Sequence, residues 1–290
     1  MTRLENEPAW TAASIGSQIA PRTTAFSWLR QRPTFLIIGA QKAGTTSLYN
    51  YLIQNPCISR STRKEVHYFD SADYRQGDAW YLSHFPLRWH PRELVARGQT
   101  RPQIAGEASP YYLAHPASAP RIKAFDPNMR LIVMLRDPVE RALSHYHHQR
   151  RHDREDLSFE DALRAEGERL AGEREKMIAD PDYYSYAYWL CGYAERGQYA
   201  KHLRHWFEHF PREQFLFIDS SAFFADPRSV YATATEFLGV SAHELAATPK
   251  KNAGSYKDMS EEARQLLHKA FEASNQDLKG LLDVPFAWLD

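Results

Sequence analysis

The chain has 290 residues, of which 43% are hydrophobic, and its 36 lysine and arginine residues balance 36 aspartate and glutamate residues. This composition predicts an ordered globular protein, and the balanced charge argues against a nucleic-acid-binding protein. Two cysteines, Cys57 and Cys191, are too few for a disulfide framework or a thiolate zinc site, so we expect a reducing compartment, the cytoplasm.

Residues 1–33 have no clear hydrophobic period, and we expect them to form an N-terminal arm. They contain acidic residues early and no apolar run long enough for the core of a signal peptide. Residues 34–290 are expected to form a single domain, and none of their apolar stretches approaches the length of a membrane span.

The first predicted strand is "TFLIIGA", residues 34–40, an apolar run typical of a strand buried on both faces of a parallel sheet. A helix is predicted over "TTSLYNYLIQNP", residues 45–56, because Leu48 and Leu52 recur at helical spacing. The sequence between them has the frame of a nucleotide-binding phosphate loop, G-x-x-x-x-G-K-[ST], with one change.

That change concerns the lysine of the loop. Gly39, Gly44 and Thr46 match the frame, whereas Thr45 takes the place of the lysine and Lys42 lies three residues earlier. The glycines allow a tight turn that exposes backbone N–H groups, and the positive end of the following helix points to the same place. We therefore expect an anion to bind here.

A second unit begins with a strand at residues 131–135 and continues into a helix that Asp137 caps and Pro138 starts. Arg136, at the tip of this strand, offers a planar fork that suits a phosphate. Ser144 follows eight residues later and is expected to face the same side if the chain folds back at Asp137 and Pro138.

A third strand is predicted in "QFLFIDSSAF", residues 214–223, between helices over residues 199–211 and 226–240. Strands that alternate with helices predict an α/β fold of three layers, with a central parallel sheet flanked by helices. Residues 153–200, between the second and third units, are expected to form a charged helical insertion.

A nucleotide-hydrolysing enzyme would also need an acidic residue at the end of a later strand to hold magnesium. The second strand ends in Arg136 instead, and the third ends in Asp219. A P-loop kinase with an irregular loop therefore stays open as an alternative, and so does a non-catalytic nucleotide-binding module.

The segments "GAQKAGTTSL" and "RDPVERALSHY" together resemble the paired phosphate-binding motifs of the sulfotransferases that use 3′-phosphoadenosine-5′-phosphosulfate (PAPS). The resemblance extends from about residue 34 over nearly the whole chain, and it implies a P-loop-like fold, PAPS as donor and 3′,5′-adenosine bisphosphate as product. It also implies that Arg136 and Ser144 bind the 3′-phosphate and that Lys42 reaches the oxygen bridging phosphate and sulfate. The residues implied to cradle the 5′ end are Lys42, Ala43, Gly44, Thr45, Thr46 and Ser47.

The segment that starts "KKNAGSYKDMSEEARQLL" resembles the closing loop of the same family, in which a basic turn passes over the nucleotide before a terminal helix. The residues implied for that turn are Lys251, Asn252, Gly254, Ser255 and Tyr256. The apolar face predicted for the helix consists of Ala263, Leu266, Leu267, Ala270 and Phe271. Without the resemblance, the turn would be a flexible surface loop.

The stretch "RKEVHYFD", residues 63–70, would place Glu65 and His67 on one face if it is extended. It resembles a stretch of the heparan sulfate-type sulfotransferases in which the glutamate is taken as the catalytic base. The resemblance implies Glu65 as the base that activates the acceptor hydroxyl, with His67 as its partner or as the alternative base.

The stretch "GEASPYYL", residues 106–113, departs from those relatives, because Ala108 stands where they have an active-site lysine. The chain also lacks cysteines for their disulfide-bonded hairpin, and both differences argue against a highly sulfated polysaccharide. We expect an acceptor hydroxyl on a small molecule, a lipid or a saccharide, either free or tethered to a carrier protein. The residues expected to line its cleft are Glu107, Ser109, Tyr111 and Tyr112.

Three histidines, His145, His148 and His152, recur at three- and four-residue spacings and could ligate a metal. They also continue a predicted helix, and the family resembled here needs no metal for sulfuryl transfer. We therefore expect no metal and predict a PAPS-dependent sulfotransferase.

Overall fold

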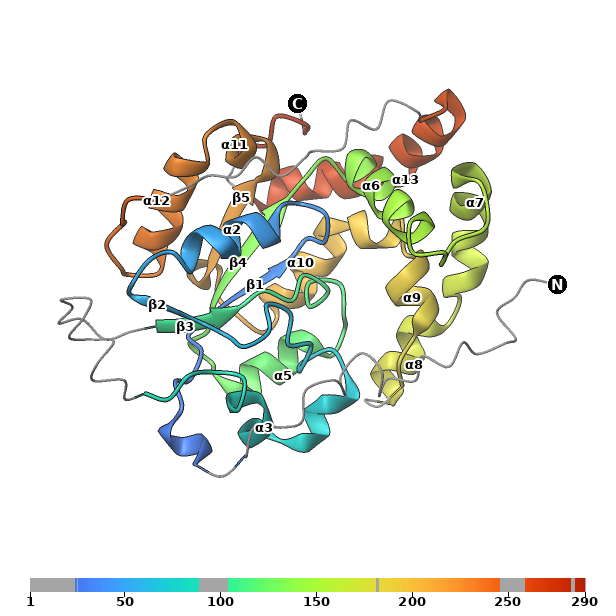
Figure 1. Cartoon of the computed structure of the whole chain (residues 1–290). Coiled ribbons are helices and arrows are strands. Elements are labelled where there is room, and N and C mark those ends of the chain that lie inside the picture. Colours follow the sequence, from blue (N-terminus) through green and yellow to red (C-terminus); the bar gives the residue numbers. More distant parts are fainter. Residues whose placement is uncertain are drawn as a thin grey trace.

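The computed structural model describes residues 24, 26–88, 104–180, 183–245, 259–282 and 285–289. A five-stranded parallel sheet lies at its centre (Figure 1). Its strands are β1 (Phe35–Gly39), β2 (Ile58–Arg60), β3 (Ile104–Glu107), β4 (Arg130–Leu135) and β5 (Phe215–Asp219), in the order β2-β3-β1-β4-β5. The parallel α/β architecture predicted from the sequence is confirmed.

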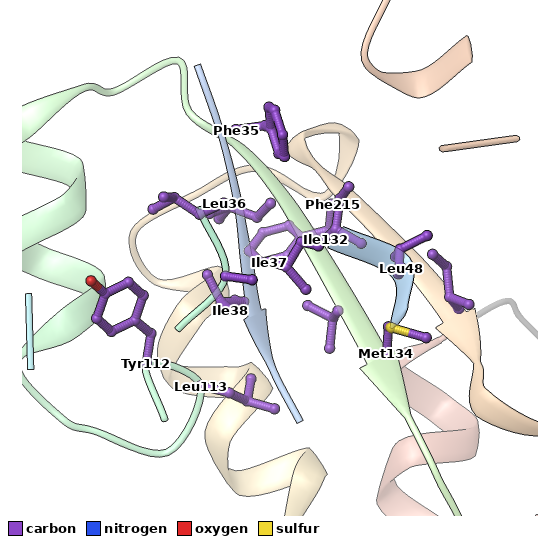
Figure 2. Close-up of a cluster of buried hydrophobic side chains, with 14 of the residues drawn as sticks. Phe35, Leu36, Ile37, Ile38, Leu48, Tyr112, Leu113, Ile132, Met134 and Phe215 are labelled. Atoms are coloured by element: carbon purple, nitrogen blue, oxygen red, sulfur yellow. The ribbon is translucent and has the colours of Figure 1, made fainter. Parts of the chain in front are cut away.

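The three strands predicted from the sequence, β1, β4 and β5, lie next to one another in this sheet. All five residues of β1 are buried, and so are residues 131–135 of β4. Figure 2 shows how Leu36 and Ile37 of β1 and Ile132 of β4 gather in one apolar cluster with Phe215 of β5. Strands covered on both faces need apolar side chains on both faces, which explains these unbroken runs.

Strands β2 and β3 were not predicted, and their composition explains why. They have three and four residues, and Ser59, Arg60, Gly106 and Glu107 interrupt any apolar pattern. Both strands form because β1 offers an unpaired edge to β3, which in turn pairs with β2. Their pairing is therefore decided by tertiary structure.

Helices cover both faces of the sheet (Figure 1). Helix α2 contacts α12 on one face, and α10 contacts α13 on the other, as right-handed crossovers in both directions from β1 require. The helices are α2 (Thr45–Leu52), α3 (Asp78–Leu82), α5 (Ser118–Phe125), α6 (Pro138–Arg150), α7 (Phe159–Leu170), α8 (Glu173–Ala179), α9 (Tyr186–Cys191), α10 (Tyr199–Phe207), α11 (Ser220–Ala225), α12 (Pro227–Phe237) and α13 (Glu261–Leu281). None of the helices in the described ranges is both long enough and apolar enough to cross a membrane.

The start of α6 is as predicted, because the Asp137 carboxylate accepts a hydrogen bond from the backbone N–H of Val139 at 2.8 Å and Pro138 begins the helix. The apolar face predicted for α13 is partly wrong, since Leu266 and Ala270 are exposed. The buried residues of α13 are Ala263, Leu267, Phe271, Ser274 and Leu278. Successive steps of four, four, three and four residues keep these side chains on one narrow stripe.

The segment at 153–200 contains α7, α8 and α9. Phe159 of α7 and Phe271 of α13 share an apolar cluster with Val139 of α6, so this segment is attached to the helix that leaves β4. Part of the expected arm also lies against the domain. Arg30 forms an isolated antiparallel β-bridge with Leu87, and the N–H of Gln31 donates to the carbonyl of Pro86 at 2.8 Å.

We predict that Gly106→Ala destabilises the protein by about 1–3 kcal/mol. A Cβ at Gly106 would lie 2.5 Å from the carbonyl oxygen of Phe35, and backbone atoms inside a sheet cannot move aside. Gly167→Ala in α7 is the matched control, because its Cβ would meet no atom within 4 Å. This substitution should raise the free energy of unfolding by about 0.5–1 kcal/mol. Urea unfolding midpoints measure both changes, and equal midpoints for the two variants would contradict the prediction.

Candidate active site

A cavity of about 940 Å³ opens at the carboxyl ends of β1, β4 and β5. Its wall includes Lys42 from the loop after β1, Arg136 at the end of β4 and Asp219 at the end of β5. In open parallel sheets, ligands bind at this edge, near the point where the strand order changes direction. Here that point is β1, which has β3 on one side and β4 on the other.

The loop after β1 has the geometry of an anion site. Lys42 and Gly44 adopt left-handed backbone conformations, with φ of 72° and 100°. Helix α2 begins directly afterwards without a side-chain cap, and the N–H groups of Thr45 and Thr46, in its first turn, precede its first backbone hydrogen bonds. Gly44, Thr45, Thr46 and Ser47 all line the cavity, where these N–H groups and hydroxyls can bind an anion.

Ala43 is the exception among the six loop residues named from the sequence. It is fully buried and does not line the cavity. Its N–H donates to the carbonyl of Ala40 at 3.1 Å, and its carbonyl accepts from the Ser220 hydroxyl at 2.9 Å. Ala43 therefore stabilises the loop through backbone hydrogen bonds and does not contact the cavity.

Arg136 and Ser144 both line the cavity, since α6 starts immediately after β4 and runs along the cavity wall. Arg136 forms an ion pair with Glu140 at 3.1 Å, and it also donates to the carbonyl of Lys42 at 3.4 Å. The Glu140 carboxylate thus occupies one side of the Arg136 guanidinium. The next residues on the same face of the helix, His148 and Arg151, also line the cavity.

Lys64 links the loop to the predicted base, and it was not identified from the sequence. Its ammonium donates to the Thr46 hydroxyl at 2.5 Å and forms an ion pair with Glu65. Both Lys64 and Glu65 line the cavity. The signal was its position directly before Glu65. Nearby, burial and the charges of Arg151 and Arg136 lower the pKa of Lys42.

His67 lies between two carboxylates and does not line the cavity. Its Nδ1 is 2.8 Å from Asp70 and its Nε2 is 3.2 Å from Glu65. Burial alone would lower the pKa of His67, but the two carboxylates outweigh it and raise this pKa to about 10. Burial would raise the pKa of Glu65, but the hydrogen bond from His67 and the charge of Lys64 lower it to about 2. At neutral pH the pair is therefore a carboxylate and an imidazolium.

The four residues expected to line the acceptor cleft are buried and do not line this cavity, so their assignment stays a prediction: they are Glu107, Ser109, Tyr111 and Tyr112. Glu107 is the last residue of β3, an internal strand that the sequence did not reveal, and the other three residues follow it. The Ser109 hydroxyl donates to Glu107 at 2.7 Å and accepts from the N–H of His67 at 3.2 Å. Burial raises the pKa of Glu107 to about 7. Ser109 therefore holds the backbone of His67, and Pro110 alone in this stretch lines the cavity.

The closing turn implied by the resemblance, with Lys251, Asn252, Gly254, Ser255 and Tyr256, lies outside the described residues. A segment nearer the C-terminus contributes to the wall instead, through Ala287 and Trp288. The Trp288 ring lies 6.0 Å from that of Tyr199, whose hydroxyl donates to the carbonyl of Arg136 at 2.9 Å. No local motif marks Trp288, so the sequence could not place it.

The three histidines considered as metal ligands do not converge. His145 is buried, with its Nε2 against Gln149 at 2.9 Å, whereas His148 lines the cavity. His152 is exposed, and its Nδ1 is bonded to the carbonyl of His148 at 2.8 Å. The three side chains therefore lie in three different environments and do not share a ligand.

Comparison with known proteins identifies the kind of enzyme to which this site belongs. Residues 32–279 match the model of a family described as the sulfotransferase domain. The chain belongs to the sulfotransferase family. The recognition made from the two paired motifs is therefore confirmed, as is the family that it named.

Two further similarities agree with this assignment. A sulfotransferase from Alicyclobacillus acidocaldarius superposes with a TM-score of 0.67 at 31% identity, covering 89% of this chain and 99% of that one. Heparan sulfate glucosamine 3-O-sulfotransferase 3A1 of Homo sapiens is 33% identical to this chain, and the match covers 79% of this chain and 50% of the human protein. Membrane-associated sulfotransferase kil1 of Dictyostelium discoideum is 27% identical, over 88% and 66% respectively. The chain thus spans less than two thirds of these two curated relatives.

The kinase alternative rested on Asp219, and the structure gives this residue another role. Asp219 caps α11, accepting from the N–H of Ser221 at 2.9 Å and from its hydroxyl at 2.6 Å. Both carboxylate oxygens of Asp219 therefore accept hydrogen bonds from Ser221. Membership of the family also favours sulfuryl transfer over phosphoryl transfer.

We predict that His67 stays protonated well above its ordinary range. Because its folded pKa of about 10 exceeds the ordinary 6.5, the charged ring stabilises the fold fully below about pH 6.5, and this stabilisation is lost as the pH rises through about 10. Asp70→Asn removes one of the carboxylates responsible, so the ring should titrate at lower pH. Imidazole NMR signals of both proteins report this directly, and a wild-type His67 that titrates near 6.5 would contradict it.

Proposed function

We propose that this sulfotransferase moves the sulfuryl group from PAPS to a hydroxyl of a small-molecule, lipid or saccharide acceptor. One observation carries the proposal: the loop after β1, the Arg136 and Ser144 pair and the Glu65 carboxylate line the same cavity. These three parts supply what sulfuryl transfer needs, namely an anion cradle, a second phosphate site and a base.

The donor fits the cavity with its two charged ends at two sites. The N-terminal amides of α2 and the Lys42 ammonium would bind the 5′-phosphosulfate, as helix N-termini bind phosphate elsewhere. Arg136 and Ser144 would bind the 3′-phosphate, for which Glu140 has to leave the guanidinium. A nucleotide without a 3′-phosphate would leave this second site unused.

In the transfer step, the acceptor oxygen attacks sulfur in line with the bond to the 5′-phosphate. A new S–O bond forms, the old S–O bond breaks, and its electron pair stays on the phosphate oxygen of 3′,5′-adenosine bisphosphate. Glu65 takes the proton of the acceptor hydroxyl. Lys42 and the loop amides stabilise the charge that grows on the leaving phosphate.

Glu65 is proposed as the base in preference to His67, because Glu65 lines the cavity and His67 does not. Both ring nitrogens of His67 face carboxylates, so its role is to position Glu65. A carboxylate whose pKa is about 2 is a weak base. If the ammonium of Lys64 turns from Glu65 to the bound phosphosulfate, the pKa of Glu65 rises as the donor binds.

The acceptor side favours a less anionic molecule than a highly sulfated polysaccharide. Ala108 stands at the place expected for an active-site lysine, and it is fully buried. We propose a small-molecule, lipid or saccharide hydroxyl, free or tethered to a carrier protein, and a cytoplasmic reaction. The names of the relatives concern heparan sulfate in one case and a membrane-associated protein in another.

We predict that Arg136→Ala weakens binding of 3′,5′-adenosine bisphosphate by about 10- to 100-fold, because one charged hydrogen-bonding partner of the 3′-phosphate is lost. Binding of 5′-AMP should change little. Arg150→Ala is the matched control, since Arg150 donates to the carbonyl of Glu155 and does not line the cavity. Calorimetric titration measures all three proteins. Preference for magnesium-ATP, with no effect of Arg136→Ala, would favour the kinase alternative.

We also predict that Glu65→Gln lowers the rate of transfer by about 10²–10⁴-fold, as expected for loss of a general base, without weakening binding of the bisphosphate. Lys42→Ala should slow transfer too. The measurement is single-turnover transfer of radiolabelled sulfate from PAPS to phenol, sterol and glycoside acceptors. Equal rates for wild type and Glu65→Gln would reject the role of Glu65, and no transfer to any acceptor would favour a non-catalytic module.

A further inference from the structure

The end of α10 brings together three side chains that the proposed reaction does not use. His205, Glu208 and His209 each offer one ligand atom, and these atoms lie within 4.8 Å of one another. Among the described residues they form the one such group of histidine, cysteine and carboxylate side chains. None of the three lines the active-site cavity. We propose that they form a binding site for a divalent transition metal, Zn²⁺ or Cu²⁺, separate from catalysis.

The tautomer of His205 leaves one nitrogen available to a metal. Its Nε2 lies 2.8 Å from the carbonyl oxygen of Pro116, and because a carbonyl only accepts, Nε2 carries the proton. In the neutral ring, Nδ1 then holds a lone pair. Metal-binding histidines commonly donate their other N–H to such a carbonyl, which fixes the ring and raises its affinity.

The spacing between His205 and Glu208 matches that of two ligands on one metal. Nδ1 of His205 lies 3.4 Å from a carboxylate oxygen of Glu208, which is long for a hydrogen bond between them. Two ligand atoms at about 2.0–2.1 Å from a tetrahedral zinc lie about 3.3–3.4 Å apart. The two atoms therefore already have the separation that zinc would impose.

His209 completes a three-ligand site from one helix end. Its ring centroid lies 5.1 Å from that of His205, one helical turn earlier. Glu208 is exposed and can adjust, the two rings are half-buried, and the carbonyl of Pro116 orients that of His205. Two imidazoles and a carboxylate are ligands that zinc and copper accept, with water in the remaining position.

Metal binding here would stabilise the attachment of α10 to the segment before α5. Trp206 donates to the carbonyl of Leu113 at 3.0 Å, and His205 contacts Pro116. The same segment begins with Pro110, which lines the cavity. A bound metal would therefore raise the melting temperature, and it would not contact the reacting groups.

The test is titration of the full chain, free of any affinity tag, with ZnCl₂ against a chromophoric chelator. We expect one zinc per chain, tighter binding of Cu²⁺ and a higher melting temperature with zinc. His209→Ala should weaken zinc binding at least about tenfold and abolish the thermal shift, and Glu208→Gln should weaken it less. Melting temperatures without metal show whether each variant is folded.

His152→Ala is the matched control, because His148 and His152 have the same four-residue spacing, with ring centroids 4.5 Å apart, and within the described ranges they belong to no group of three potential ligands. This variant should bind zinc like the wild type. Absence of stoichiometric zinc binding by the wild type would overturn the proposal, and so would equal affinity for zinc in wild type and a folded His209→Ala. Loss of binding in His152→Ala instead would place the metal on α6.

Discussion

Parallel pairing of β1 with β4, and of β4 with β5, is the constraint on which the whole site depends. The registers Leu36 with Leu131 and Leu135 with Asp219 bring the carboxyl ends of the three strands to one edge. Because such strands are buried on both faces, their own side chains are apolar, and polar chemistry is confined to the loops. Those loops include residues as far apart in the sequence as Lys42 and Asp219, and they meet because the sheet aligns them.

A line of alternating charges joins the two halves of the site. The Lys64 ammonium touches Thr46 in the anion loop and Glu65 in the proposed base, and His67 connects Glu65 to Asp70. Each charge has an opposite neighbour, which is how charged groups withdrawn from water are stabilised. An anion that draws Lys64 away would change the basicity of Glu65. The arrangement therefore gives a physical route by which donor binding affects the acceptor side.

The motifs led to the anion loop, Arg136, Ser144 and Glu65, which line one cavity, because each lies within a few residues of a strand end or in a recognisable local pattern. Whether other side chains reach this cavity depends on distant partners. Glu107 ends β3, whose four residues carry no strand signal, and Tyr112 follows it; both side chains are buried and neither lines the cavity. Lys64 and Trp288 also line the cavity; Lys64 lies beside Glu65 in the sequence, whereas no motif pointed to Trp288.

The sequence by itself determined the α/β class, the three apolar strands, the start of α6 and the family, since strand burial, helix capping and the phosphate-loop frame are local properties of the chain. Tertiary structure decided the pairing of β2 and β3, the exposure of Leu266, and the separation of His67 from the cavity. It also decided which histidines converge, those at the end of α10 and not those of α6. The physical reason is that a local pattern fixes an element, whereas a side chain's surroundings depend on the elements packed around it.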